Sequence, residues 1–299
     1  MPILRLLGGQ LAIGAAAIFT RLALEGAGPL AISALRLGLA TLVLVLLGTR
    51  PRGLGRRREV ALACAGLALA AHFAAWIASL QYTSVARATL LVTTTPLWLA
   101  VAGALRTRRF PSRAVVAALV LALAGVAVVA VGSGGRDAPI RGYDGLGEAL
   151  ALGGAVAIGL YLELVRTAGG GNAPASTGQI VLRTYGWAAV VLVVGAAALR
   201  EPPPPFGAAH AWFGIAGMVL GSQLLGHTAL ARALRDFTPT TVATSTLLEP
   251  VIAAGLAAPI FGERVGPAVI VGGILLLAGI ALALRADGAS QFEATAAPP

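Results

Sequence analysis

The sequence has no lysine, a single cysteine and few charged residues of either sign. Of its 299 residues, 58% are hydrophobic and only 11% are charged, and the mean hydropathy is +0.86. A water-soluble protein carries about 25% charged residues. Because so few polar groups cannot cover the surface of a soluble protein, lipid must form part of the surroundings of this chain.

The lone cysteine, Cys64, excludes a disulfide within the chain, and the sequence shows no spacing of ligands typical of a metal site. Since Cys64 lies within an apolar run, we interpret it as a small buried hydrophobic residue. The sequence also lacks a GxxxxGK[ST] phosphate-binding loop and a soluble domain to hold one. We therefore expect no cofactor, no metal, no catalytic residue and no ATP-driven activity by this chain alone.

The net charge of +10 comes entirely from arginine. In a soluble protein such a charge would suggest nucleic acid as a partner. Here the arginines cluster between apolar runs, as at 50–58 and 106–113, so we read them as a membrane-topology signal and expect no nucleic acid. The excess of arginine on one side predicts a multi-pass protein of the cytoplasmic (inner) membrane of a bacterium, with both termini cytoplasmic.

Ten apolar runs are each long enough to cross a bilayer. A hydrocarbon core about 30 Å thick needs about 20 residues of helix, and a helix satisfies its own backbone groups in hydrocarbon. The expected spans are 3–24, 30–49, 60–80, 84–105, 113–132, 145–166, 177–199, 210–231, 238–261 and 266–285. The sequence thus predicts an all-α integral membrane protein of ten helices, followed by a disordered cytoplasmic tail at 286–299.

Two stretches of the chain resemble each other. YTSVARATLLVTTTP at 82–96 and FTPTTVATSTLLEP at 237–250 both open on an aromatic residue and threonine, contain Ala-Thr and close on proline. We infer two five-helix repeats, 1–142 and 143–285. Because five is odd, the second repeat enters the membrane from the opposite side. Inverted repeats of this kind are typical of secondary transporters, with the binding site near the midplane between the halves.

These residues resemble the drug/metabolite transporter superfamily, EamA type, over about 3–285. The resemblance lies in SLQYTSVARATLLVTTTPLW at 79–98, LEPV at 248–251 and FGER at 261–264. It implies a ten-helix carrier with inverted repeats that exports amino acids, metabolites or drugs, without naming a substrate. The first repeat has RTRRF at 106–110 where the family typically carries a Gly-Glu-Arg-like end, so no acidic residue is carried over to that place.

Proline interrupts two of the expected spans, at Pro96 and Pro250. Each proline removes one helical hydrogen bond, and the freed carbonyl must be satisfied by a side chain, by water or by another helix. The hydroxyls beside Pro96, including Thr94, can bond neighbouring carbonyls. We interpret both bends as gating or lining a cavity, with a simple packing kink as the alternative.

Glu249 lies about halfway along the span 238–261, where a charge is costly and is often functional. It shares one helical face with Ser245 and Thr241, at spacings of four residues. Glu249 could bind a substrate amine, carry a proton, or donate a hydrogen bond while neutral. The alternative is a protonated acid with a structural hydrogen bond.

Two further stripes of polar and aromatic residues occur within expected spans. His72 and Trp76 share one helical face, and Gln223 and His227 share another. The histidines could shuttle protons, and tryptophans could stack on a flat substrate or fill volume. The full set of predicted substrate-binding residues is His72, Trp76, Thr94, Trp98, Gln223, His227, Ser245 and Glu249.

Arg36 and Arg183 lie at corresponding places in the two proposed repeats, each six residues into its span. We expect both side chains to reach lipid headgroups, as long basic side chains do near helix ends. A salt bridge or a contact with a substrate carboxylate is the alternative. Glycines in the spans 113–132 and 266–285 indicate close helix packing, and the pattern leaves open whether this lies within one chain or in a homodimer.

The sequence as a whole predicts a secondary transporter that exports a small metabolite, amino acid or drug by alternating access. Its partners are the small-molecule substrate and the lipid bilayer, with protons as a candidate coupling ion. A polytopic membrane enzyme and a channel are the alternatives. The acidic residues are scattered along the chain rather than grouped, and no filter loop is evident, so both alternatives fit the sequence less well.

Overall fold

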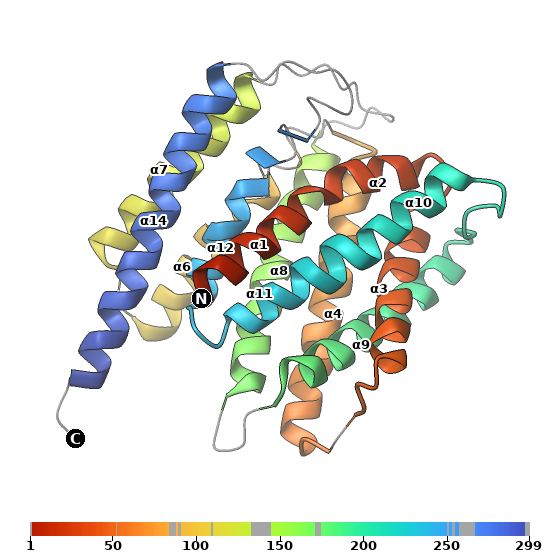
Figure 1. Cartoon of the computed structure of the whole chain (residues 1–299), viewed down its shortest axis with the longest axis horizontal. Coiled ribbons are helices and arrows are strands. Elements are labelled where there is room, and N and C mark those ends of the chain that lie inside the picture. Colours follow the sequence, from red (N-terminus) through yellow and green to blue (C-terminus); the bar gives the residue numbers. More distant parts are fainter. Residues whose placement is uncertain are drawn as a thin grey trace.

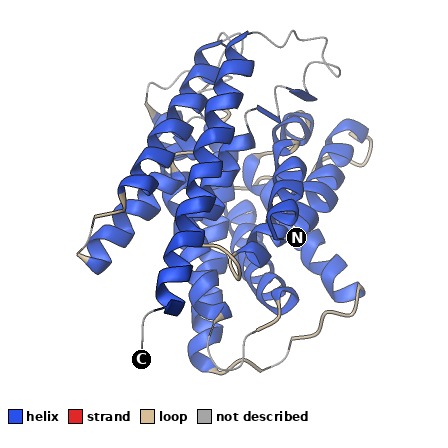
Figure 2. Cartoon of the chain, turned by 60° about the vertical axis from the view of Figure 1, so that its left-hand side comes forward, coloured by secondary structure: helices blue, strands red, loops and turns tan. Residues whose placement is uncertain are grey.

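The computed structural model describes residues 2–51, 53–83, 88, 91–108, 110–132, 145–170, 175–249, 251–252, 255–256 and 267–296. Within these ranges every regular element is a helix, and no strand occurs (Figure 2). The prediction of an all-α membrane protein is confirmed for this part of the chain.

The helices follow the order of the expected spans. Those of the first half are α1 (Pro2–Gly14), α2 (Ala16–Leu24), α3 (Pro29–Leu46), α4 (Arg56–Ser79), α6 (Thr95–Thr107) and α7 (Arg113–Gly132). Those of the second half are α8 (Leu146–Gly169), α9 (Thr177–Ala198), α10 (Ala209–Gly217), the π-helix η1 (Met218–His227), α11 (Thr228–Ala233), α12 (Pro239–Ser245), the 3₁₀ turn η2 (Thr246–Leu248) and α14 (Pro267–Ala296).

Among the described residues, six helical stretches are long and apolar enough to cross a membrane. They are Pro2–Leu24, Pro29–Leu46, Arg56–Ser79, Leu146–Gly169, Thr177–Ala198 and Ala209–Ala233. Two shorter apolar helices cover Arg113–Val128 and Ile270–Ala286. The expected spans 84–105 and 238–261 fall partly outside the described residues, so the total of ten stays a prediction.

Apolar side chains cover much of the outer surface, as expected of a protein in lipid. Leu46 and Leu105 are about three-quarters exposed, at 75% and 76%. Soluble monomers rarely expose large contiguous apolar areas. Cys64 lies on the outer face of α4, between the exposed residues Val60 and Leu67. The expectation that it is buried is therefore wrong, because the apolar run around it faces outward as well as inward.

The helices pack in pairs that join the two halves of the sequence. α4 packs on α8 and α9, while α2 and α1 pack on α10 and η1, respectively. Three further pairs are α3 with α9, α6 with α12, and α7 with α14. In Figure 1 the α7–α14 pair forms one edge of the molecule, and α3, α4 and α9 lie on the opposite side.

Glycine allows α7 and α14 to approach closely within one chain. A Cβ atom on Gly125 of α7 would lie 2.6 Å from the carbonyl oxygen of Gly272, and one on Gly279 would lie 2.8 Å from the Cβ of Ala122. Such distances leave no room for a side chain. These glycines therefore serve packing within one chain, and the homodimer stays a prediction.

α14 continues to Ala296, well beyond residue 285 where the last span was expected to end. The segment 286–296 was predicted to be disordered, and the structure has helix there instead. Residues 297–299 lie outside the described part. Alanine at four of these eleven positions favours helix, whereas Asp287, Gly288 and Thr295 disfavour it, so composition alone does not decide where the helix ends.

Candidate functional site

A buried cavity lies among α1, α3, α4, α8 and the interrupted helices of both halves. Its volume is about 50 Å³. Its apolar wall includes Ile13, Phe73, Ile158 and Leu162. The polar residues in the wall are Arg36, His72, Trp76, Thr93, Thr95, His227, Thr246 and Glu249. Four of the eight predicted substrate-binding residues, His72, Trp76, His227 and Glu249, are thus brought together at one place.

Arg36 enters this cavity from α3 and is completely buried, with 0% of its surface exposed. Its Nε atom donates to Oε1 of Gln223 at 2.8 Å, and its guanidinium carbon lies 4.0 Å from the centre of the Phe73 ring. Among the described residues, neither Nη1 nor Nη2 has a hydrogen-bond partner. The expectation that Arg36 reaches the headgroups is therefore wrong: the side chain turns inward, where an amide and a ring face hold it.

Aromatic side chains surround the Arg36 guanidinium on the α4 side. The rings of His72 and His227 meet Phe73 edge-on, with centroids 4.9 Å and 5.2 Å away, and His72 stacks on Trp76. Phe73 thus presents its negatively polarised face to the cation, the geometry that favours cation–π attraction. The tryptophan indole Nε1 and the Nδ1 atom of His227 have no partner within the described residues.

His72 is held in one orientation by the neighbouring helix α8. Its Nδ1 atom lies 2.9 Å from the carbonyl oxygen of Gly154. Because a carbonyl only accepts, Nδ1 must carry a proton in this contact, and in the neutral ring Nε2 is then the acceptor. His72 therefore contributes an acceptor nitrogen to the site.

Gln223 lies in the π-helix η1, which interrupts the span formed by α10 and α11. Its side chain orients Arg36, and its backbone carbonyl accepts from the Tyr185 hydroxyl at 3.3 Å. π-helical turns are rare and often mark functional sites. Gln223 is buried behind Arg36 and does not form part of the cavity wall, so its assignment to substrate binding stays a prediction.

The first interrupted helix breaks at Thr93 and Thr94, and α6 begins at Thr95, with Pro96 at its second position. The Thr95 hydroxyl donates to the carbonyl of Val92 at 2.9 Å and lies 3.1 Å from that of Ala155 in α8. The Val92 carbonyl lies four residues before Pro96 and is the one that the proline ring deprives of its usual donor. The break in the helix lets the nearby hydroxyl reach it.

The second interrupted helix shows the same chemistry. Ser245 donates to the carbonyl of Val242 at 2.6 Å and Thr246 to that of Ala243 at 2.8 Å, where α12 gives way to the 3₁₀ turn η2. Glu249 follows η2 and lines the cavity. Pro250 lies outside the described residues, so the bend predicted there stays a prediction.

The remaining predicted residues do not form part of the cavity wall. Ser245 is fully buried and accepts from Nε2 of Gln10 in α1 at 2.7 Å. Thr94 donates to the carbonyl of Leu91 at 2.6 Å and accepts from Nε1 of Trp98 at 3.2 Å. Trp98 is 38% exposed. A direct role in substrate binding stays a prediction for these three residues.

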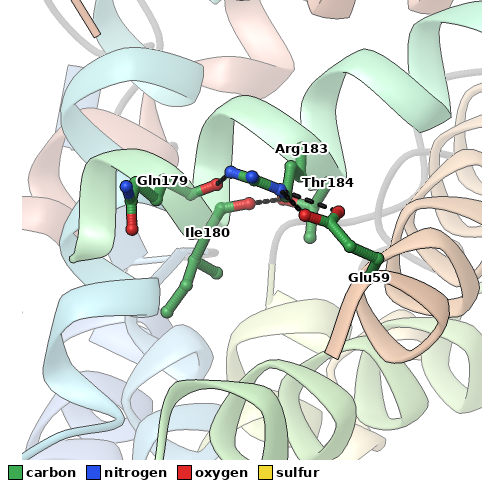
Figure 3. Close-up of polar contacts among 5 residues, drawn as sticks. All are labelled: Glu59, Gln179, Ile180, Arg183 and Thr184. Atoms are coloured by element: carbon green, nitrogen blue, oxygen red, sulfur yellow. Dashed lines mark hydrogen bonds and ion pairs between the residues drawn. The ribbon is translucent and has the colours of Figure 1, made fainter. Parts of the chain in front are cut away.

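Arg183 in α9, the counterpart of Arg36, meets a different environment. Its Nε atom lies 2.8 Å from both carboxylate oxygens of Glu59 in α4, and Figure 3 shows the two side chains turned toward each other. Its Nη1 atom also donates to the Gln179 carbonyl at 3.4 Å. The headgroup expectation is wrong for Arg183 as well, since a resident acid binds its guanidinium.

Sequence reasoning omitted Arg36 and Phe73 from the predicted site. The signal for Arg36 was present, since it lies six residues into an apolar span. The sequence gave no signal for Phe73, because a phenylalanine in an apolar run cannot be distinguished from a packing residue until its neighbours are known. In the described part of the chain, no three His, Cys, Asp or Glu side chains are grouped closely enough to hold a metal ion.

Comparison with known proteins gives one family and a fold. The sequence model of the EamA-like transporter family matches residues 1–131 and 145–285. A crystal structure of a protein is similar with a TM-score of 0.74 at 19% sequence identity, over 96% of this chain and 97% of the other. At that identity the likeness concerns the fold alone. No curated protein sequence matches.

Proposed function

Because the chain belongs to the EamA-like transporter family, we propose that it exports a small metabolite, amino acid or drug across the cytoplasmic membrane by alternating access. That it is a multi-pass membrane protein of a small-molecule transporter family follows from the family match and the apolar helices. The direction of transport, the mechanism, the bacterial inner membrane and the cytoplasmic position of both termini are parts of the proposal.

Helix packing supports the inverted repeats on which alternating access depends. In the proposed repeats α3 corresponds to α9, and α4 corresponds to α10 with η1. If the repeats are related by a two-fold axis, each contact between two helices should occur a second time between their counterparts in the other half. The pair α4–α8 recurs as the packing of α10 and η1 on α2 and α1, and α4–α9 recurs as η1–α3. The pairs α3–α9, α6–α12 and α7–α14 each map onto themselves. This pattern favours repeats at 1–142 and 143–285.

The observation that carries the proposal is the cavity with Arg36, His72 and Glu249 in its wall. Intramembrane ionisable groups are costly and typically mark a substrate or ion pathway. The wall draws residues from both halves, as an alternating-access site requires. At about 50 Å³ the cavity is far below the several hundred Å³ that a drug-sized ligand needs. This conformation therefore favours a small metabolite over a large drug.

Energy for export would come from a gradient, since the sequence has no phosphate-binding loop. Glu249 and the two buried histidines are the candidate proton carriers in the wall. Proton coupling predicts that a pH difference across the membrane drives substrate accumulation. Facilitated diffusion predicts only equilibration.

A two-stage experiment tests the function. Cells that overproduce the protein are first challenged with toxic amino acids, amino acid analogues and drugs, and resistance identifies candidate substrates. The purified protein is then placed in proteoliposomes, where saturable flux of the same compound is expected. Flux that rises linearly with concentration up to the solubility limit would favour a channel, and absence of flux for every protective compound would reject the proposal.

A further inference from the structure

We propose that Arg36 is the anion-binding residue of the cavity and that the site takes small molecules through a carboxylate group bound end-on to Nη1 and Nη2. This inference rests on the proposed transport function and names the chemical class that the site recognises. It depends on three observations: the unpartnered atoms of Arg36, its contrast with Arg183, and the size of the cavity.

The contacts of Arg36 leave one edge of the guanidinium free. Nε is occupied by Gln223 at 2.8 Å, and one planar face rests on Phe73 at 4.0 Å. In the described structure Nη1 and Nη2 are buried and have no hydrogen-bond partner. Buried polar atoms are nearly always hydrogen-bonded, and a guanidinium presents two parallel N–H donors that match a carboxylate. The orientation is fixed before a ligand arrives.

Arg183 provides an internal comparison. It occupies the corresponding helix of the other half and is also buried, but Glu59 supplies a resident carboxylate at 2.8 Å. At Arg36 the corresponding contact is with the uncharged amide of Gln223. Glu249 lines the same cavity and attracts Arg36 electrostatically, but within the described residues it forms no ion pair with Arg36. In one half an ion pair binds the arginine, while in the other Nη1 and Nη2 of the arginine have no hydrogen-bond partner in the described structure.

The cavity limits which anion fits. Among the described residues of its wall, Arg36 is the one arginine, and the cavity volume is about 50 Å³. A phosphate dianion is usually held by several donors and cations, whereas a carboxylate needs one guanidinium fork. The free Nε1 of Trp76 and Nδ1 of His227 can bond the rest of the ligand. A short carboxylate, such as a three-carbon acid, therefore fits better than phosphate.

The test measures binding to the purified protein in neutral detergent by isothermal titration calorimetry, at constant ionic strength set with chloride. The probes are propionate, L-alanine, their amides propionamide and L-alaninamide, and inorganic phosphate. We expect propionate or L-alanine to bind at least about tenfold more tightly than its own amide, because a charge-assisted bidentate contact is lost in the amide. Phosphate should bind more weakly than the preferred carboxylate.

Variants assign the preference to one side chain. Arg36→Gln should remove the discrimination between carboxylate and amide, and Arg36→Lys, which keeps the charge but not the fork, should keep part of it. Arg106→Gln, which alters an arginine on the surface paired with Glu163, is the matched control and should bind as the wild type does. If Arg36→Gln fails to fold, the comparison of acid and amide on the wild type still tests whether the site prefers a carboxylate.

Three patterns of binding would overturn the inference: equal affinity of acid and amide for the wild type, tighter binding of phosphate than of either carboxylate, or undiminished discrimination in folded Arg36→Gln. Absence of binding by both carboxylates at about 100 mM, some hundred times a millimolar dissociation constant, would also overturn it. Saturable transport of an uncharged compound with no carboxylate binding would leave the transport function standing and remove this inference. Carboxylate binding without flux of any compound would support this inference and reject the transport function.

Discussion

Arg36 in α3 and Gln223 in η1 are joined by a 2.8 Å hydrogen bond that links the two halves of the chain inside the membrane-spanning bundle. Arg183 in α9 reaches in the opposite sense, to Glu59 in α4. Each half therefore sends an arginine to the other, but within the described residues only Arg183 forms an ion pair, while Arg36 bonds an amide and interacts with Glu249 without direct contact. The Arg183–Glu59 contact is therefore structural, whereas the Arg36–Gln223 contact leaves two nitrogen atoms of Arg36 for a ligand.

Glu249→Gln is expected to reduce transport about tenfold or more while leaving the protein folded in the membrane, because it removes the carboxylate from the cavity wall. Flux of an identified substrate in proteoliposomes, with and without a pH gradient, measures the effect. Glu163→Gln is the control, since Glu163 pairs with Arg106 on the surface and should transport at nearly the wild-type rate. Full transport by Glu249→Gln would remove Glu249 from the mechanism.

Glu59→Gln should lower stability by about 1–2 kcal/mol, because the buried guanidinium of Arg183 loses a charge-assisted partner, while the exposure of the Glu59 side chain (39%) moderates the loss. Thermal unfolding in detergent measures it. In a double-mutant cycle with Arg183→Gln, the two losses should be less than additive. Additive losses would mean that the two side chains do not interact.

Thr95→Val is expected to destabilise the protein by about 1–3 kcal/mol, because the buried carbonyl of Val92, which Pro96 deprives of its helical donor, loses the hydroxyl at 2.9 Å. Thr95→Ser keeps the hydroxyl and should stay close to the wild type. Unfolding temperatures of the three proteins give the comparison. Equal stability of the valine and serine variants would show that the hydroxyl does not satisfy the break.

Gly125→Ala should cost about 1–3 kcal/mol, because its Cβ would lie 2.6 Å from the Gly272 carbonyl and would force α7 and α14 apart. Gly153→Ala is the matched control: it lies on α8 with open space around the added carbon, so it should be neutral or slightly stabilising. Similar unfolding temperatures for the two variants would contradict the close packing of α7 and α14.

Part of the candidate site could be found from the sequence because polar groups are rare in apolar spans. His72, Trp76, His227 and Glu249 were identified in this way, and all four line one cavity. The sequence did not predict the exposed position of Cys64 or the continuation of α14 to Ala296. An apolar run fits lipid as well as it fits a core, and local composition does not decide where a helix stops.

The residues alone determined that this chain lies in a membrane, that its described regular structure is helical and that a helix is interrupted at the threonines before Pro96, because hydrocarbon tolerates few arrangements of backbone and charge. Only the tertiary structure decided which way Arg36 and Arg183 point and which of them meets an acid. The reason is physical: a long side chain six residues into a span can reach either the headgroups or the interior. The choice depends on whether a distant helix supplies a partner, and Gln223 and Glu59 lie 187 and 124 residues away in the sequence.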